Sequence, residues 1–259
     1  MTTAKPLPAD IRLMNIAATV LFAAGIALLL AAGGWWVLRH PVFKVAGITV
    51  EGDVSHNNAA TLRANVAPHL TGNFFTLDLG AAREAFEAVP WVRHAVVRRE
   101  FPDRLRVQLE EHRAAALWGA DADTRLVDTF GEVFEANVGD VENEDLPRLE
   151  GPEGQAGEVL AMYRMLKPLF EPLGLGVERV TLTARGSWEV ELENEGVIEL
   201  GRGTSGEIAA RTQRFVRTLN QVTSRYSRTP QALISADLRH TDGYALRLRG
   251  VGTTDAVKK

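Results

Sequence analysis

The sequence predicts an α+β protein with three parts: one N-terminal transmembrane helix, a small module with the element order β-α-α-β-β, and a mostly antiparallel β-domain with flanking helices. Three observations predict this class. A long apolar segment lies near the N-terminus, short runs of alternating apolar and polar residues recur along the rest of the chain, and most connections are too short for parallel crossovers. At 259 residues and 46% hydrophobic, the chain can form one or two domains with a core.

The apolar segment Ile16–Val37 contains no charged residue. A helix of about 22 residues would span about 33 Å, close to the ~30 Å hydrocarbon core of a bilayer. Trp35 and Trp36 lie at its far end, where interfacial aromatic residues are expected. We therefore predict a cytoplasmic tail over residues 1–15 and a transmembrane helix over residues 16–38.

A cleaved signal peptide is the alternative interpretation of this segment. The small residues Ala31, Ala32 and Gly33 could be read by a peptidase. The apolar run is, however, longer than a usual signal-peptide core of roughly 7–15 residues. Basic residues flank both ends, so charge alone does not set the orientation. A short tail before an uncleaved anchor favours a cytoplasmic N-terminus with the large domain outside.

The predicted small module covers residues 43–112. Its expected elements are a strand over 44–51, a helix capped by Asn57, a helix capped by Asp78 and ended by Pro90, and two strands over 94–100 and 104–111. In the last strand Leu105, Val107 and Leu109 alternate with polar residues. That alternation indicates one buried face and one solvated face.

Short strands and turns dominate the predicted β-domain, residues 113–250. The expected strands cover 125–128, 131–134, 177–184, 188–194, 197–200, 232–239 and 244–249, with an extended segment over 146–152 and helices over 157–170 and 207–223. Pro168 and Pro172 are expected to end the first of these helices. The small, polar tail over residues 251–259 is predicted to be disordered.

Composition argues against several kinds of chemistry. The net charge of -4 disfavours a nucleic-acid binder, and the absence of cysteine removes disulfides, thiolate ligands and a cysteine nucleophile. The six histidines show no i, i+4 pair and no metal-type carboxylate cluster nearby, so no metal is expected. No serine lies in a G-x-S-x-G motif. We expect no catalytic site, no cofactor and no small-molecule substrate.

One short segment of the chain is rich in glycine. Residues 201–206 match G-x-G-x-x-G between a predicted strand and a predicted helix, which is the local context of a dinucleotide site. The preceding strands are expected to pair as hairpins, and the acidic residue expected at the end of the next strand is missing. The favoured interpretation is a tight turn in which Thr204 or Ser205 caps the helix.

The last predicted strand is a candidate binding surface. Tyr244, Leu246 and Leu248 alternate with Ala245 and two arginines, Arg247 and Arg249. A last strand is often an edge strand, whose free backbone groups can accept a partner's strand. Its basic face would favour an acidic partner. The alternative is an ordinary edge strand whose arginines prevent aggregation.

Two resemblances follow from these residues. The order of elements in residues 43–112, with the run Val89–Val92 and Pro102 in the hairpin, resembles a POTRA domain, a module that binds polypeptides outside the cytoplasm. The chain from residue 16 to residue 250 resembles the FtsQ/DivIB family of bacterial division proteins. The phrases that carry this resemblance are Leu126-Val127-Asp128 with Gly131 and Phe134, Leu146-Pro147 with Gly151-Pro152, Leu200-Gly201-Arg202-Gly203, and Asp237-Leu238-Arg239 with Gly243.

The family resemblance implies a non-enzymatic scaffold of the division machinery in the cell inner membrane, with its large domain in the periplasm at the septum. It implies binding to FtsB and FtsL, and through them control of the septal peptidoglycan synthase FtsW–FtsI. Carried over by position, the partner-binding residues are Arg185, Arg239, His240, Asp242, Gly243, Tyr244, Leu246 and Leu248. Arg239 would pair with a partner carboxylate. His240 and Leu248 depart from the aromatic residues that relatives often carry there.

Two rival functions compete with this interpretation of the sequence. The first is a POTRA protein of another secretion or outer-membrane assembly pathway, but such chains usually continue into a membrane β-barrel. The second is a membrane-anchored periplasmic enzyme, which would require a cleft with perturbed carboxylates or a metal.

Overall fold

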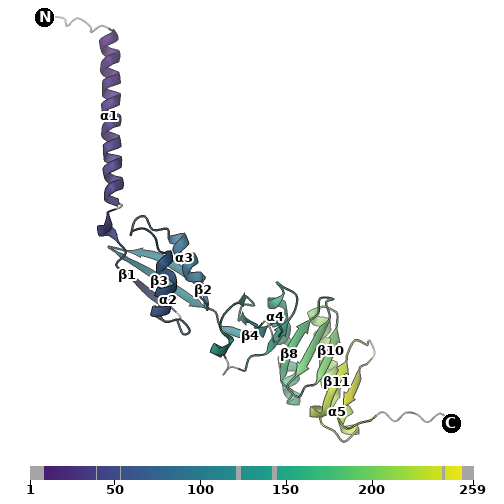
Figure 1. Cartoon of the computed structure of the whole chain (residues 1–259). Coiled ribbons are helices and arrows are strands. Elements are labelled where there is room, and N and C mark those ends of the chain that lie inside the picture. The colour runs from purple at the N-terminus through teal and green to yellow at the C-terminus, as the bar shows by residue number, and fades with distance from the viewer. Residues whose placement is uncertain are drawn as a thin grey trace, which may run out of the picture. The chain divides into compact units, whose positions relative to one another are not determined.

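The computed structural model describes residues 9–38, 40–52, 54–120, 124–141, 145–240 and 243–252. It confirms the predicted α+β class, with one N-terminal apolar helix, a β-α-α-β-β module and a largely β C-terminal domain (Figure 1). The chain divides into two compact units, residues 1–111 and 112–259, each with its own core.

The N-terminal helix α1 (Ala9–Leu38) contains the predicted apolar segment and begins several residues before it. Within the described part of the chain, it is the one helix that is long and apolar enough to cross a bilayer. Large apolar side chains such as Leu21, Phe22 and Leu29 are more than two-thirds exposed. A helix that is apolar on all sides and unburied by protein suits a lipid environment.

A three-stranded sheet forms the basis of the first unit. Its elements are β1 (Gly47–Gly52), α2 (Ala59–Val66), α3 (Leu79–Glu87), β2 (Val92–Glu100) and β3 (Arg104–Glu111), with 3-10 turns at Pro41–Phe43 and Ala67–His69. β3 lies in the centre, parallel to β1 and antiparallel to β2. Leu105, Val107 and Leu109 are buried, as their alternation predicts.

Of the two helix caps predicted in this unit, the structure confirms one and contradicts the other. Asp78 caps α3 as predicted, accepting from the backbone N–H groups of Gly80 and Ala81. The predicted cap of α2 was wrong, because Asn58 rather than Asn57 accepts from the first turn. Asn57 is buried instead, and its side-chain amide donates to Glu111 Oε1 at 3.0 Å. Sequence alone does not distinguish adjacent asparagines when one has a distant partner.

The second unit is built on a nine-stranded sheet in the order β12-β11-β10-β9-β8-β7-β4-β5-β6. The strands are β4 (Ala114–Trp118), β5 (Arg125–Asp128), β6 (Val133–Phe134), β7 (Arg148–Glu150), β8 (Val177–Leu182), β9 (Trp188–Leu192), β10 (Val197–Gly201), β11 (Leu233–Asp237) and β12 (Ala245–Leu248); the helices are α4 (Ala156–Phe170) and α5 (Ser205–Arg225), with 3-10 turns at Val138–Val141, Glu171–Leu173 and Pro230–Ala232.

Most neighbours in this sheet are antiparallel, as predicted, but three pairs are parallel: β4–β7, β7–β8 and β10–β11. Two of the parallel pairs are joined through a helix, β7–β8 by α4 and β10–β11 by α5. Both helices contact the sheet and each other, so they cover the same face. Their buried residues, including Leu166, Phe170, Phe215 and Leu219, belong to one core with the sheet.

One helix end differs from the prediction. Pro168 lies inside α4, which continues to Phe170, so the expectation that Pro168 ends the helix was wrong. Pro172 lies in the 3-10 turn that follows, and Gly174 then adopts a left-handed conformation that ends the helical path. Phe170 is fully buried, and this anchor favours continuing the helix past the proline.

Candidate functional site

The last strand, β12, lies at one edge of the nine-stranded sheet, beyond β11 (Figure 1). It pairs antiparallel with β11 only, so the backbone groups on its other side have no strand neighbour in the described sheet. Leu246 is half-buried and Leu248 is 3% exposed, whereas Ala245 and Arg247 are exposed. The strand thus has the two-faced edge geometry that can accept an additional strand.

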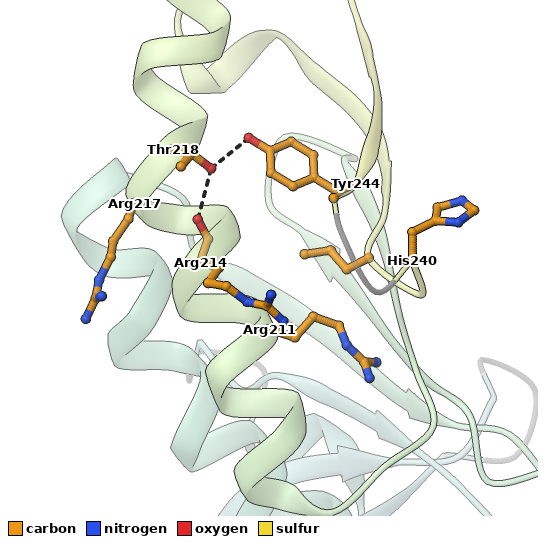
Figure 2. A pocket seen from close by; sticks show the side chains of 8 residues that line it. Arg211, Arg214, Arg217, Thr218, His240 and Tyr244 are labelled. Atoms are coloured by element: carbon orange, nitrogen blue, oxygen red, sulfur yellow. Dashed lines mark hydrogen bonds between the residues drawn. The ribbon is translucent and has the colours of Figure 1, made fainter.

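Tyr244 fixes the beginning of β12 to helix α5 (Figure 2). Its hydroxyl oxygen lies 2.8 Å from Thr218 Oγ1. Its ring packs edge-on against Phe215, with the ring centroids 5.0 Å apart. At the other end of the strand, Leu248 belongs to the core of the unit. An edge strand held at both ends loses little freedom when a partner pairs with it.

Arg239, which follows β11, is held by carboxylates of its own chain. Its Nε and Nη2 donate to the two oxygens of Asp237 at 2.9 and 2.7 Å. Its Nη1 lies 2.7 Å from Glu199 Oε2. The bond from Arg239 lowers the pKa of Asp237 to about 2, and Asp237 in turn raises the pKa of Arg239. A carboxylate from another molecule would therefore contact a guanidinium that is already oriented, and it would share this group with Asp237 and Glu199.

The structure brings the other predicted residues to the same end of the sheet. His240 and Gly243 follow β11, and Arg185 is exposed in the turn between β8 and β9. That turn lies at the same end because Leu182 pairs with Trp188, and Trp188 pairs with Gly201, next to Arg239. His240 is exposed, with its Nε2 4.0 Å from Asp237 Oδ2. Asp242 lies outside the described residues.

The glycine motif of residues 201–206 lies at the same end of the sheet. The expectation that no acidic residue ends the next strand was wrong, because β11 ends at Asp237. Thr204 caps α5 in a capping box, in which its Oγ1 accepts from the Glu207 N–H and its own N–H donates to Glu207 Oε2 at 2.7 Å. The Glu207 carboxylate thus occupies the helix N-terminus where a phosphate would bind in a dinucleotide site. Gly201 has a φ of +78°, and a Cβ there would lie 2.8 Å from the Arg239 side chain. The glycine allows Arg239 to pack closely.

Sequence reasoning missed the cationic side chains of α5 that lie beside this site. Arg211, Arg214, Arg217 and Thr218 line a cavity together with His240 and Tyr244 (Figure 2). The arginines recur at every third position, so that neighbours along the series lie close to each other on the helix surface. That spacing is visible in the sequence, but only the fold shows that this side lies next to the start of β12.

One group of side chains has the ligand types of a metal site, contrary to the sequence expectation of no such cluster. His112, Asp128 and Glu132 have ligand atoms within 4.8 Å of one another. Asp128 Oδ1 accepts from the N–H groups of Phe130 and Glu132, and its Oδ2 lies 2.9 Å from His112 Nδ1. Through these contacts, the buried Asp128 carboxylate stabilises the turn between β5 and β6.

Comparison with known proteins gives two family matches. Residues 43–112 match the family described as POTRA domain, FtsQ-type, and residues 116–239 match the family described as Cell division protein FtsQ/DivIB, C-terminal. Curated relatives called "Cell division protein FtsQ" include one from Burkholderia pseudomallei strain K96243, 43% identical over 96% of this chain and 99% of the relative. Another, from Bordetella pertussis strain Tohama I, is 39% identical over 92% of both chains. A third, from Neisseria meningitidis serogroup B, is 31% identical over 87% of this chain and 92% of the relative.

Proposed function

Because this chain belongs to the FtsQ family of cell division proteins, we propose that it is a non-enzymatic scaffold of the bacterial division machinery. It spans the inner membrane once through α1, with its N-terminus in the cytoplasm and its C-terminal domain in the periplasm at the septum. It binds FtsB and FtsL, links early and late division proteins, and through this complex controls septal peptidoglycan synthesis by FtsW–FtsI.

The observation that supports this mechanism best is the position of β12 at the sheet edge. Addition of a strand from FtsB would pair the free backbone groups of β12, and the alternating side chains would give selectivity. Tyr244, Leu246 and Leu248 support the strand from its core side. Arg185, Arg239, His240, Asp242 and Gly243 are the proposed contacts at its beginning.

The Arg239 pairs give the proposed contact a specific form. A guanidinium has five N–H donors, and the two carboxylates of Asp237 and Glu199 use its Nε and both Nη atoms. An acidic side chain of FtsB would bind by taking over part of this network. The intramolecular pairs hold the guanidinium in place before the partner arrives, which reduces the entropic cost of the contact.

The rival functions have less support. A role in another POTRA pathway lacks a supporting observation, since the matched relatives share nearly the whole length and are division proteins. A periplasmic enzyme would need a group of reactive side chains in a cleft. The His112 group carries hairpin hydrogen bonds instead.

The test is a binding measurement with the full-length chain in lipid nanodiscs and the periplasmic segment of FtsB from the same organism. The variant Gly243→Pro removes a backbone N–H and fixes φ just before β12. Gly243 does not adopt a left-handed φ, and a Cβ there meets no atom within 4 Å, so a side-chain carbon at this position causes no clash. The matched control is Gly206→Pro, in the first turn of α5, where proline is tolerated.

We expect wild type and Gly206→Pro to bind with similar affinity. Gly243→Pro should bind roughly tenfold more weakly, because a tenfold change corresponds to about the net free energy of one backbone hydrogen bond. Melting curves establish that both variants fold. Undiminished binding by a folded Gly243→Pro protein would move the interface away from β12. Absence of binding by the wild type would contradict the scaffold function and favour a different POTRA pathway.

A further inference from the structure

A basic groove lies between α5 and the described residues that follow β11 and precede β12 (Figure 2). The cavity has a volume of about 290 Å³; among its described lining residues are Arg211, Arg214 and Arg217 from the helix, His240 after β11, and Gly243 and Tyr244 before β12. Arg211 and Arg214 extend from α5 towards the side on which His240 lies, and Arg217 projects from the other side of the helix (Figure 2).

The lining of this groove is cationic. None of the lining residues in the described part of the chain is acidic, although the whole chain has a net charge of -4. The single acidic residue of α5, Glu207, is engaged with Thr204 in the capping box. The nearby carboxylates of Asp237 and Glu199 are engaged with Arg239. Arg211 and Arg214 therefore lie near carboxylates that, among the described residues named above, are already paired.

The individual arginines differ in how firmly they are held. Arg211 donates through Nη1 to the carbonyl oxygens of Leu200 and Arg202, which fixes it across the end of β10. Arg214 is exposed, and its backbone carbonyl accepts from the Thr218 hydroxyl, which also contacts Tyr244. Arg214 thus lies on the same turn of α5 as Thr218, which contacts Tyr244 just before β12. Its guanidinium can form a bidentate pair with a carboxylate at little cost in backbone order.

The groove is continuous with the edge of β12. Gly243 and Tyr244 line the groove and directly precede the first residue of the strand, Ala245. A polypeptide that pairs along β12 and continues past this end would enter the groove within a few residues, at about 3.3 Å per extended residue. One ligand can therefore engage both surfaces.

We propose that the α5 groove receives an acidic segment of the same polypeptide that adds a strand to β12. This inference rests on the proposed function, and it assigns to Arg214 and its neighbours the recognition of carboxylates next to the added strand. The strand supplies backbone pairing that is largely independent of sequence, whereas the groove selects for negative charge beside it. A segment without carboxylates would pair with β12 but would leave the groove empty.

The experiment uses the full-length chain in zwitterionic nanodiscs and the periplasmic segment of FtsB, with the dissociation constant measured over a range of salt concentrations. The test variant is Arg214→Glu. Its new carboxylate would lie three residues from both Arg211 and Arg217, a spacing that supports the helix. The matched control, Arg225→Glu, makes the same charge change 11 residues further along α5, about 16 Å away and beyond the screening length of about 8–10 Å.

We expect Arg214→Glu to weaken binding roughly tenfold, with a shallower salt dependence, and Arg225→Glu to stay within about twofold of wild type. The milder variant Arg214→Gln should lie between them, which guards against a folding defect. If Arg214→Glu binds with wild-type affinity while Gly243→Pro still binds more weakly, the proposed role of the groove would be wrong. Strand addition to β12 would then remain supported. Equal losses in both charge variants would also overturn the role of the groove, because the effect would then be long-range. No binding by the wild type would overturn both proposals.

Discussion

Glu189 belongs to a row of carboxylates that lie next to one another across neighbouring strands of the sheet. Its cross-strand partner on β10 is Glu199, and Glu199 is in turn aligned with Asp237 on β11. Burial raises the pKa of Glu189, and the carboxylates of Glu199, Glu191 and Glu150 add to this effect. Like charges directly opposite each other across two strands are destabilising. Arg239 neutralises part of this row through Glu199 and Asp237.

The sign of the resulting pH dependence follows from the raised pKa of Glu189. Between the ordinary pKa near 4.5 and the raised folded value, the folded state binds more protons than the unfolded state. The contribution of Glu189 to stability is therefore largest below that window and is lost as the pH rises through it. At neutral pH the ionised carboxylate is a net cost to folding.

We therefore predict that Glu189→Gln stabilises the chain at pH 7, by up to about 0.5 kcal/mol because the side chain is largely exposed. The gain should disappear below about pH 4, where the carboxyl is protonated in both states. Denaturant unfolding at the two pH values measures it. The control Glu135→Gln, an exposed position after β6, should change stability little at either pH. A loss of stability at pH 7 in Glu189→Gln would contradict the repulsion described.

At the scale of elements, the capping box at the start of α5 fixes the helix that braces β12. The Thr204 hydroxyl accepts from the Glu207 N–H at 3.3 Å, and the Glu207 carboxylate returns the contact to Thr204. The backbone bond from Thr204 also lowers the pKa of Glu207. The same turn sets Gly201 against Arg239. One short connection thus orients both the helix and the arginine.

Replacement Thr204→Ala should cost about 1 kcal/mol of stability, the usual effect of losing an N-cap hydroxyl. Thr204→Ser keeps the hydroxyl and should remain close to wild type. Chemical denaturation of the two variants measures the difference. Equal stability of the alanine and serine variants would mean that the cap does not hold the start of α5.

Local patterns in the sequence predicted most elements, and the misses have physical causes. Alternation predicted β3 and β12, and Asp78 gave the start of α3. β4 was not predicted, because its alanines give no alternation, and its place is set by parallel pairing with β7. The sequence suggested Asn57 as a helix cap because it does not reveal the actual partner of this side chain, Glu111, which is 54 residues away. Contacts at such separations leave no periodic trace.

The candidate site was predictable only in part for the same reason. Its location on the last strand followed from order along the chain and from the family resemblance. The pairing of Arg239 with Glu199 joins residues 40 positions apart and is set by the parallel register of β10 and β11. The proximity of Arg214 to the start of β12 likewise depends on how α5 packs. Tertiary packing determines both features.

At the scale of the whole molecule, the chain combines a membrane-spanning candidate, a POTRA unit and a β-unit whose sheet ends in an available edge. The sheet has two edges, β6 and β12. β6 is two residues long, a length that limits pairing with another chain. β12 is longer, anchored at both ends and flanked by the basic groove. The difference between the edges favours β12 as the partner surface.

If β12 gains a strand from its partner, amide hydrogen exchange along β12 should slow when the partner binds. The full-length chain in nanodiscs would be measured with and without the periplasmic segment of FtsB. We expect slower exchange in residues 245–248, because outward N–H groups become hydrogen-bonded, with no change in β6 at the opposite edge. Protection of β6 or of the first unit, with exchange in residues 245–248 unchanged, would contradict it.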